Sequence, residues 1–107
     1  MKILDLVLMH KWYDMIESGE KPEEYREITP YWINRLTCLD ELEIGHYIGI
    51  TPIPFKDYDA VRFRRGYTKT TMLFDIKDMS VGRGNKAWGA PDFPTFVIRI
   101  GERIDEQ

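Results

Sequence analysis

Hydrophobic residues at alternating and then helical spacing predict a strand followed by a helix at the start of the chain. Residues 3–9 predict a buried strand, because apolar side chains occupy both of its faces and Leu4, Leu6 and Leu8 share one of them. Residues 11–18 follow with an apolar helical stripe, which consists of Trp12, Met15 and Ile16. Gly19 stands where the glycine that ends a helix is expected.

A second helix is predicted over residues 30–37. Thr29 can cap this helix with its hydroxyl group, and Pro30 fits the first helical position. The apolar stripe of the helix consists of Trp32, Ile33, Leu36 and Leu39. We therefore expect this helix to cover the strands as a structural element.

Three strands are predicted in the second half of the chain, over residues 61–64, 70–79 and 95–100. In the first of them, Val61 and Phe63 face inward and two arginines face the other side. The inward side chains of the other two strands are Met72, Phe74, Ile76, Phe96, Ile98 and Ile100.

The long segment over residues 40–59 has a weaker pattern than the rest of the chain. Only residues 47–50 predict a short strand, because Pro52 and Pro54 argue against a central strand beyond them. A connection of this length in a small domain is either functional or an insertion. At the other end of the chain, we expect the acidic tail from Glu102 to be frayed.

These elements predict the fold class. About five or six short strands and two helices indicate an α+β, mainly β fold, a small open β-barrel with the helices packed against it. The 107 residues suffice for one domain with a modest core.

The composition excludes several classes of protein. The chain is 43% hydrophobic and 31% charged, as in ordinary globular proteins, and no apolar run approaches the roughly 20 residues of a membrane span. We therefore expect no membrane contact. Cys38 is the single cysteine, which forbids an internal disulfide and favours a cytoplasmic protein. His10, His46 and Cys38 lack the spacing of a zinc site, so we predict no metal and no cofactor.

The net charge and the distribution of charged residues indicate which kinds of nucleic-acid ligand the protein can bind. The net charge of -3 argues against a protein that binds nucleic acid through bulk electrostatics. The charged residues between positions 60 and 71 are nevertheless all basic, namely Arg62, Arg64, Arg65 and Lys69. A local basic patch on an acidic body suits a small anionic ligand or a short single strand better than a duplex.

The charged segment after Gly19 is the first candidate site. If a strand begins at Glu24, then Glu24 and Arg26 share one face, and such a pair can position a polar ligand. A bend at Pro22 can bring the ammonium group of Lys21 over the same site. The alternative is a solvated edge strand with scattered ion pairs.

The same segment carries a family resemblance. The pattern G-x-K-x-x-E-x-R is reproduced by Gly19, Lys21, Glu24 and Arg26. It resembles the signature motif of the ASCH domain, a relative of the PUA domains that bind RNA, and the similarity extends through residues 61–64 and 88–91 to residues 96–101. The resemblance implies that residues 1–107 form a single ASCH/PUA-like domain, in which the motif lines a cleft beside the barrel.

A second candidate element is the strand face that carries Arg62 and Arg64, followed by Tyr67. Arginine binds phosphate or carboxylate through paired hydrogen bonds, and a tyrosine can stack on a base. The alternative is a solvent-facing strand whose arginines serve solubility. Trp88 lies in a loop rich in glycine and proline, where it is either a plug over the barrel end or an aromatic wall of the cleft. Trp12 is interpreted as a core residue, with base stacking as the alternative.

Two functions follow from these candidates. In the first, the protein binds RNA or a nucleotide or nucleoside, with basic side chains on phosphate and an aromatic face, Tyr67, Trp88 or Tyr25, under a base. The ligand-binding residues are then Gly19, Lys21, Glu24, Arg26, Arg62, Arg64, Tyr67 and Trp88.

The second function is implied by the resemblance. Some ASCH proteins are amidohydrolases that act on N4-acylated cytidines through a lysine, a threonine and a further glutamate. Lys21 matches that lysine, whereas Glu24 stands in place of the threonine, so the hydroxyl nucleophile is missing. The catalytic residues would then be Lys21 and Glu24, with Glu24 as a general base on water and Lys21 stabilising an oxyanion.

Overall fold

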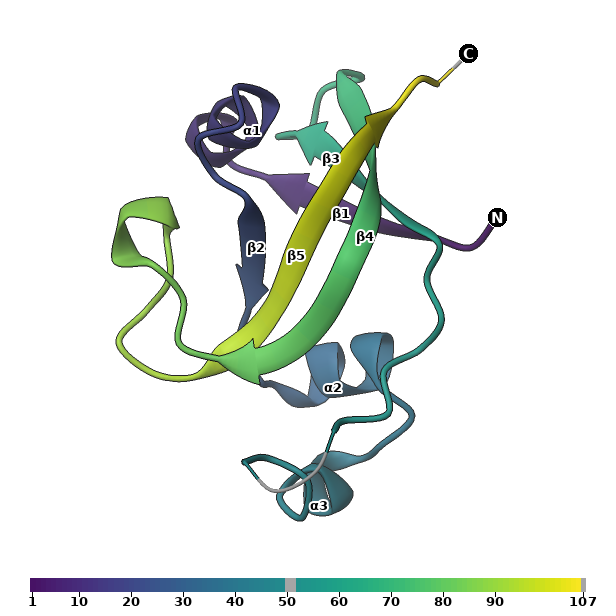
Figure 1. Cartoon of the computed structure of the whole chain (residues 1–107), viewed down its shortest axis with the longest axis vertical. Helices are drawn as coiled ribbons and strands as arrows, with labels where there is room; N and C mark the ends of the chain where they lie inside the picture. The colour runs from purple at the N-terminus through teal and green to yellow at the C-terminus, as the bar shows by residue number, and fades with distance from the viewer. Residues whose placement is uncertain (50–51, 107) are drawn as a thin grey trace. The chain divides into compact units, whose positions relative to one another are not determined.

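The computed structural model describes residues 1–49 and 52–106. Five strands form one sheet in the order β1-β3-β4-β5-β2 (Figure 1). The strands are β1 (Ile3–Leu8), β2 (Glu23–Arg26), β3 (Ala60–Arg65), β4 (Thr71–Gly82) and β5 (Thr95–Ile104). The helices are α1 (His10–Glu17), α2 (Pro30–Leu36), α3 (Glu41–Ile44) and the 3-10 helix η1 (Lys86–Trp88). Because β1 and β2 end the strand order, the sheet is open, and the predicted α+β, mainly β fold class is confirmed.

The chain divides into two compact units. The first contains Met1–Glu24, Asp57–Asp78 and the chain from Ile98 onward, and the second contains Tyr25–Lys56 and Met79–Val97. The strands β4 and β5 each contribute residues to both units. Among the described residues, no helix is long and apolar enough to cross a membrane.

In the first unit, β3 is paired on both sides. β1 runs parallel to it with Ile3 opposite Ala60, and β4 runs antiparallel to it with Phe74 opposite Val61. The buried side chains of these strands include Leu4, Leu6, Leu8, Val61, Phe63, Met72 and Phe74. The inward faces that alternation predicts for these three strands are therefore confirmed at these positions.

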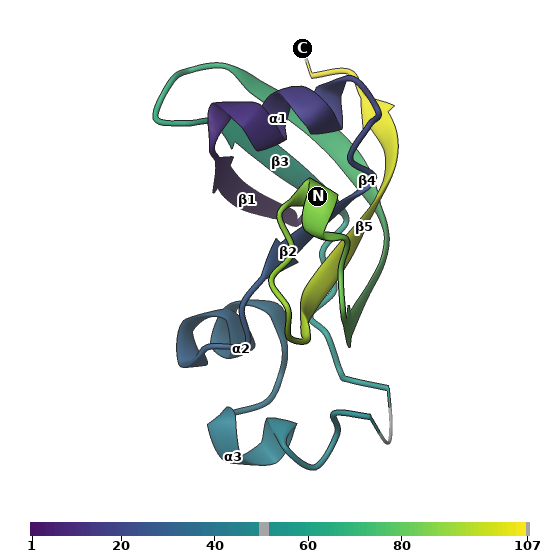
Figure 2. The same cartoon turned by 90° about the vertical axis from the view of Figure 1, so that its left-hand side faces the viewer.

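The helix α1 lies against β1 and β3 (Figure 2). It buries Tyr13 and Ile16, whereas Trp12 is only half-buried. The predicted apolar stripe was therefore wrong at its first position, where Tyr13 is buried instead of Trp12. Because Trp12 and Tyr13 are adjacent, the sequence pattern allows either of them to face the core. Packing against β1 and β3 selects the face that carries Tyr13. Gly19 has a φ of 87°, which confirms the predicted glycine after the helix end.

In the second unit, the start of α2 agrees with its prediction. The hydroxyl group of Thr29 accepts a hydrogen bond from the backbone N–H of Trp32 at 3.3 Å, and Pro30 occupies the first turn. The helix buries Ile33 and Leu36.

In the connection after α2, one helix was missed and one predicted strand was wrong. The short helix α3 was not predicted, although Asp40 and Glu43 form a capping box whose spacing is visible in the sequence. Residues 47–49 form a turn where a strand over residues 47–50 was predicted, and residue 50 lies outside the described residues. Glycine at positions 45 and 49 favours a turn over a strand.

The predicted fraying from Glu102 was also wrong, because β5 continues to Ile104. β4 is the neighbour of β5 in the sheet, and a Cβ atom at Gly101 would lie 3.0 Å from Cβ of Asp75 on β4. Arg103 adds an ion pair with Glu17 of α1 at 3.7 Å. Pairing with a neighbouring strand satisfies backbone groups that an isolated tail leaves to water.

Candidate functional site

The segment between α1 and β2 is held in place by backbone hydrogen bonds. The N–H of Lys21 donates to the carbonyl of Met15 at 2.9 Å, and the carbonyl of Pro22 accepts from the N–H of Ile100 at 3.0 Å. The left-handed backbone of Gly19 lets the chain turn back along the helix end. Lys21 is thereby positioned beside the start of β2.

Lys21 and Glu24 form a buried ion pair. Nζ of Lys21 lies 3.1 Å from Oε1 of Glu24, and the two residues are 1% and 5% exposed. The same ammonium group lies 5.5 Å from the ring centroid of Trp12, within range of a cation–π interaction. The two motif residues are therefore brought together, but as a closed pair within the first unit. Trp12 completes this cluster, and its i+9 spacing from Lys21 gave no sequence signal for the contact.

The guanidinium group of Arg62 is occupied by two carboxylates. Arg62 lies 2.6 Å from Glu106 and 3.3 Å from Asp5. The hydrogen bond to Glu106 raises the pKa of Arg62 above its usual value, and in return lowers the pKa of Glu106. A phosphate group would have to displace these partners, so the geometry favours a structural role for Arg62.

Arg64 and Arg65 differ in their partners. Arg65 forms two hydrogen bonds to the carboxylate of Asp14, at 2.9 and 3.0 Å, which lower the pKa of Asp14. Arg64 donates to the backbone carbonyl of Thr68 at 2.8 Å. Tyr67 follows them in the turn between β3 and β4 and is 97% exposed.

In the second unit, Arg26 lies in the wall of a cavity beside Trp32. The guanidinium carbon of Arg26 is 5.1 Å from the ring centroid of Trp32, and Tyr31 packs edge-on against the same indole at 4.8 Å. The cavity has a volume of about 400 Å³, at the lower end for small-ligand sites. It is lined by Tyr25, Arg26, Glu27, Thr29, Trp32, Gly89, Pro91 and Thr95. We call it the Arg26 cavity.

The Arg26 cavity combines an aromatic ring with groups of both charges. Arg26 carries several hydrogen-bond donors, one of which donates to the carbonyl of Tyr25 at 3.5 Å, and the exposed Glu27 carries an acceptor. Thr95 is fully buried, and its hydroxyl group has no hydrogen-bond partner in the described part of the chain. The cavity is thus suited to a flat ligand with polar edges.

Trp88 packs against a small core cluster of the second unit. The cluster consists of Tyr25, Ala90 and Val97, and the hydroxyl group of Tyr25 accepts a hydrogen bond from the N–H of Asn85 at 3.0 Å. Trp88 is not among the residues that line the Arg26 cavity. The two roles considered for Trp88, a plug over the barrel end or an aromatic wall of the cleft, stay predictions. Trp32 and Thr95 line the cavity instead. Trp32 was assigned to the apolar stripe of its helix, and Thr95 was only the first residue of a predicted strand, so neither was proposed for this cavity.

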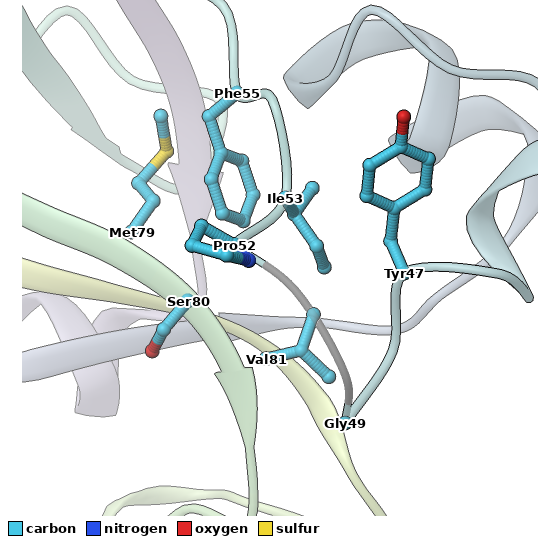
Figure 3. Close-up of a pocket in the computed structure, with 8 residues that line it drawn as sticks. All are labelled: Tyr47, Gly49, Pro52, Ile53, Phe55, Met79, Ser80 and Val81. Atoms are coloured by element: carbon cyan, nitrogen blue, oxygen red, sulfur yellow. The ribbon is translucent and has the colours of Figure 1, made fainter.

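Another cavity of the second unit is mainly apolar. Its volume is about 290 Å³, and Figure 3 shows Phe55, Ile53 and Val81 between Met79 and Tyr47. Phe55 also packs edge-on against Phe96 at 5.9 Å. With no charged residue in its lining, this cavity offers little to an anionic ligand.

The residues that the sequence suggested as ligand contacts therefore fall into two groups. Gly19, Lys21, Glu24, Arg62, Arg64 and Tyr67 belong to the first unit, and Arg26 and Trp88 to the second. No protein-family model, curated protein or solved structure matches the chain.

Proposed function

We propose that this protein binds RNA or a nucleotide, and that one base enters the Arg26 cavity. The observation that carries the proposal is the 5.1 Å contact between Arg26 and Trp32 in the wall of that cavity. Aromatic side chains are stacking surfaces for bases, and each stack is worth about 1–3 kcal/mol. An arginine beside the stack supplies donors for phosphate or for acceptors on the base edge.

Two further features support a nucleotide as the ligand. Glu27 can accept hydrogen bonds from the amino group of a base, so the cavity contains both a donor and an acceptor. The resemblance of Gly19, Lys21, Glu24 and Arg26 to the ASCH motif points to the same class of ligand.

The test is a titration of the wild-type protein with nucleosides, nucleoside monophosphates and short RNAs by calorimetry. We expect Trp32→Ala to weaken binding by about 5- to 150-fold, because the stacking surface is lost. Trp32→Phe retains an aromatic ring and should retain most of the affinity. Arg26→Gln should weaken binding of a monophosphate more than that of its nucleoside.

The matched control is Tyr47→Ala, which removes an aromatic ring from the apolar cavity of the same unit. It should leave nucleotide affinity unchanged. Circular dichroism of each variant establishes that it is folded. The proposal is overturned if the wild-type protein binds none of these ligands, or if folded Trp32→Ala and Trp32→Phe both bind as the wild type does.

A second candidate, hydrolysis of an N4-acylated cytidine, is favoured by the 3.1 Å contact between Lys21 and Glu24. A carboxylate can act as a general base on water, with an ammonium group beside it for the oxyanion. The exposed fractions of 1% and 5% weigh against it, because a substrate must reach both groups. Incubation with N4-acetylcytidine and chromatography of the products decide the matter. Turnover that falls about 10²–10⁴-fold in Glu24→Gln with binding retained would establish the enzyme.

A further inference from the structure

The turn between β3 and β4 presents an aromatic side chain to solvent. We call residues 66–69 of this turn the hairpin tip. Tyr67 is 97% exposed, so its ring has almost no contact with the rest of the protein. The ring of Tyr67 is therefore not used for packing.

The backbone of the hairpin tip is nevertheless well ordered by hydrogen bonds. The N–H of Arg65 donates to the carbonyl of Thr70 at 3.0 Å, and the hydroxyl group of Thr68 donates to the carbonyl of Arg65 at 2.6 Å. Arg64 donates to the carbonyl of Thr68 at 2.8 Å. The N–H of Gly66 donates to the carbonyl of Leu8 at 2.7 Å, which ties the tip to the end of β1.

Gly66 fixes the conformation further. Its φ of 58° lies in the left-handed region, and a Cβ atom there would come within 2.8 Å of Nε2 of His10. The hairpin tip is thus seated against the start of α1, and the side chain of Tyr67 projects from it into solvent. A tyrosine held on an ordered backbone loses little conformational entropy when it binds a partner.

The charges around Tyr67 are positive and only partly neutralised. Arg62 and Arg65 have carboxylate partners, as described above. Arg64 and Lys69, on either side of Tyr67, form no ion pair with any described residue. Two positive charges therefore flank an exposed aromatic ring, on a protein whose net charge is -3.

We propose that the hairpin tip stacks on a base and contacts phosphates of single-stranded nucleic acid, so that this protein binds a strand more tightly than a free nucleotide. An aromatic platform beside cationic side chains is the combination with which proteins hold single strands. The proposal rests on the proposed function, because that function supplies the class of ligand. It adds a contact that a mononucleotide in the Arg26 cavity does not need.

The test compares single strands of about ten nucleotides with mononucleotides. The strands are an RNA and a DNA of matching sequence. We expect Tyr67→Ser to lower affinity for both strands by about 5- to 150-fold and to leave mononucleotide affinity unchanged. Tyr67→Phe keeps the ring and should bind strands as the wild type does. Lys69→Gln should reduce the slope of log K against log salt by about 0.7, the value for one phosphate contact.

The control is Leu42→Ser. Leu42 is another exposed apolar side chain, with 83% of its surface accessible, but it lies on α3 between the acidic residues Glu41 and Glu43. This substitution should change no affinity. If the wild-type protein binds mononucleotides but Tyr67→Ser binds strands as tightly as the wild type, the role of the hairpin tip is refuted and the proposed function stands. If the wild type binds neither, both are refuted. A loss confined to RNA or to DNA supports the contact with that strand alone. An unchanged strand affinity with an altered oligomeric state in sedimentation also overturns the strand contact.

Discussion

The ammonium group of Lys21 lies 3.1 Å from the carboxylate of Glu24, and both side chains are almost completely excluded from solvent. Removing two charges from water costs several kcal/mol for each ion, and their attraction offsets this cost only when both are present. The stability of the first unit therefore depends on the pair more than on either residue alone.

Removal of one partner should be more harmful than removal of both. We expect Lys21→Met to lower the free energy of unfolding by about 3–5 kcal/mol, because it leaves the charge of Glu24 buried. The double variant Lys21→Met/Glu24→Leu should recover most of this loss. Urea denaturation measures both. Losses that simply add in the double variant would show that the two charges are not coupled.

Phe63 of β3 is the largest fully buried strand residue among the described residues of the first unit. Its ring centroid lies 6.0 Å from that of Phe74. We expect Phe63→Ala to cost about 3–5 kcal/mol of unfolding free energy, through lost burial and the cavity left behind. Val7→Ala, at a position that is 44% exposed on β1, should cost less than about 1 kcal/mol. An equal effect of the two substitutions in thermal denaturation would contradict the assigned faces of these strands.

Gly82, the last residue of β4, and Gly84, two residues further on, should differ sharply in their tolerance of alanine. A Cβ atom at Gly84 would collide with the ring of Tyr25 and with Cβ of Ala90, whereas a Cβ atom at Gly82 would meet nothing within 4 Å. Gly84→Ala should therefore destabilise the second unit by about 1–3 kcal/mol, as overpacking does. Gly82→Ala is the control and should be nearly neutral. Equal midpoints in urea would mean that Tyr25 can move aside.

Tyr13→Phe should stabilise the protein. The hydroxyl group of Tyr13 is buried in α1 and has no hydrogen-bond partner in the described ranges, and burial raises its pKa. Removing a buried polar group without a partner recovers its desolvation cost, about 1–3 kcal/mol. An increase in the denaturation midpoint supports this account. A decrease would show that the hydroxyl group is hydrogen-bonded, for example to a buried water molecule.

The ion pair between Asp14 and Arg65 should make stability depend on pH in the acid range. The hydrogen bonds from Arg65 lower the pKa of Asp14 below its usual range. Because its pKa is lower in the folded state, this contribution is complete above the unfolded-state pKa and is lost as pH falls through the folded-state pKa. Arg65→Gln should raise the pKa of Asp14 in an NMR titration and weaken this acid dependence.

The carboxyl group of Glu106 is the internal control for that titration. Its pKa is lowered by a different arginine, Arg62, and should stay low in Arg65→Gln. If Asp14 titrates identically in the wild type and the variant, Arg65 is not the cause of its low pKa.

Much of the fold was predictable because the signals are local. The cap at Thr29, the glycine after α1 and the alternation of Leu4, Leu6 and Leu8 each depend on a few neighbouring residues. The capping box of α3 is equally local. It was missed because the prolines and glycines that follow led us to treat the whole segment as irregular. Such signals establish where an element begins and which of its faces is apolar.

The candidate site was predictable only in part. The bend expected at Pro22 was enough to suggest that Lys21 and Glu24 meet, as they do at 3.1 Å. The partners of Arg62 are 57 and 44 residues away, so no local pattern indicated that two carboxylates contact its guanidinium group. The contact of Arg26 with Trp32 likewise depends on how α2 packs after β2.

The core of each strand of the sheet, the two longer helices, the cap at Thr29 and the glycine after α1 could be predicted from the sequence alone, because backbone preferences and hydrophobic periodicity act over a few residues. Tertiary structure alone decided that α1 buries Tyr13 instead of Trp12, that Arg62 is neutralised, and that Arg26 and Trp32 share a cavity. These outcomes depend on which distant surfaces pack together, and burial then selects among side chains that are locally equivalent.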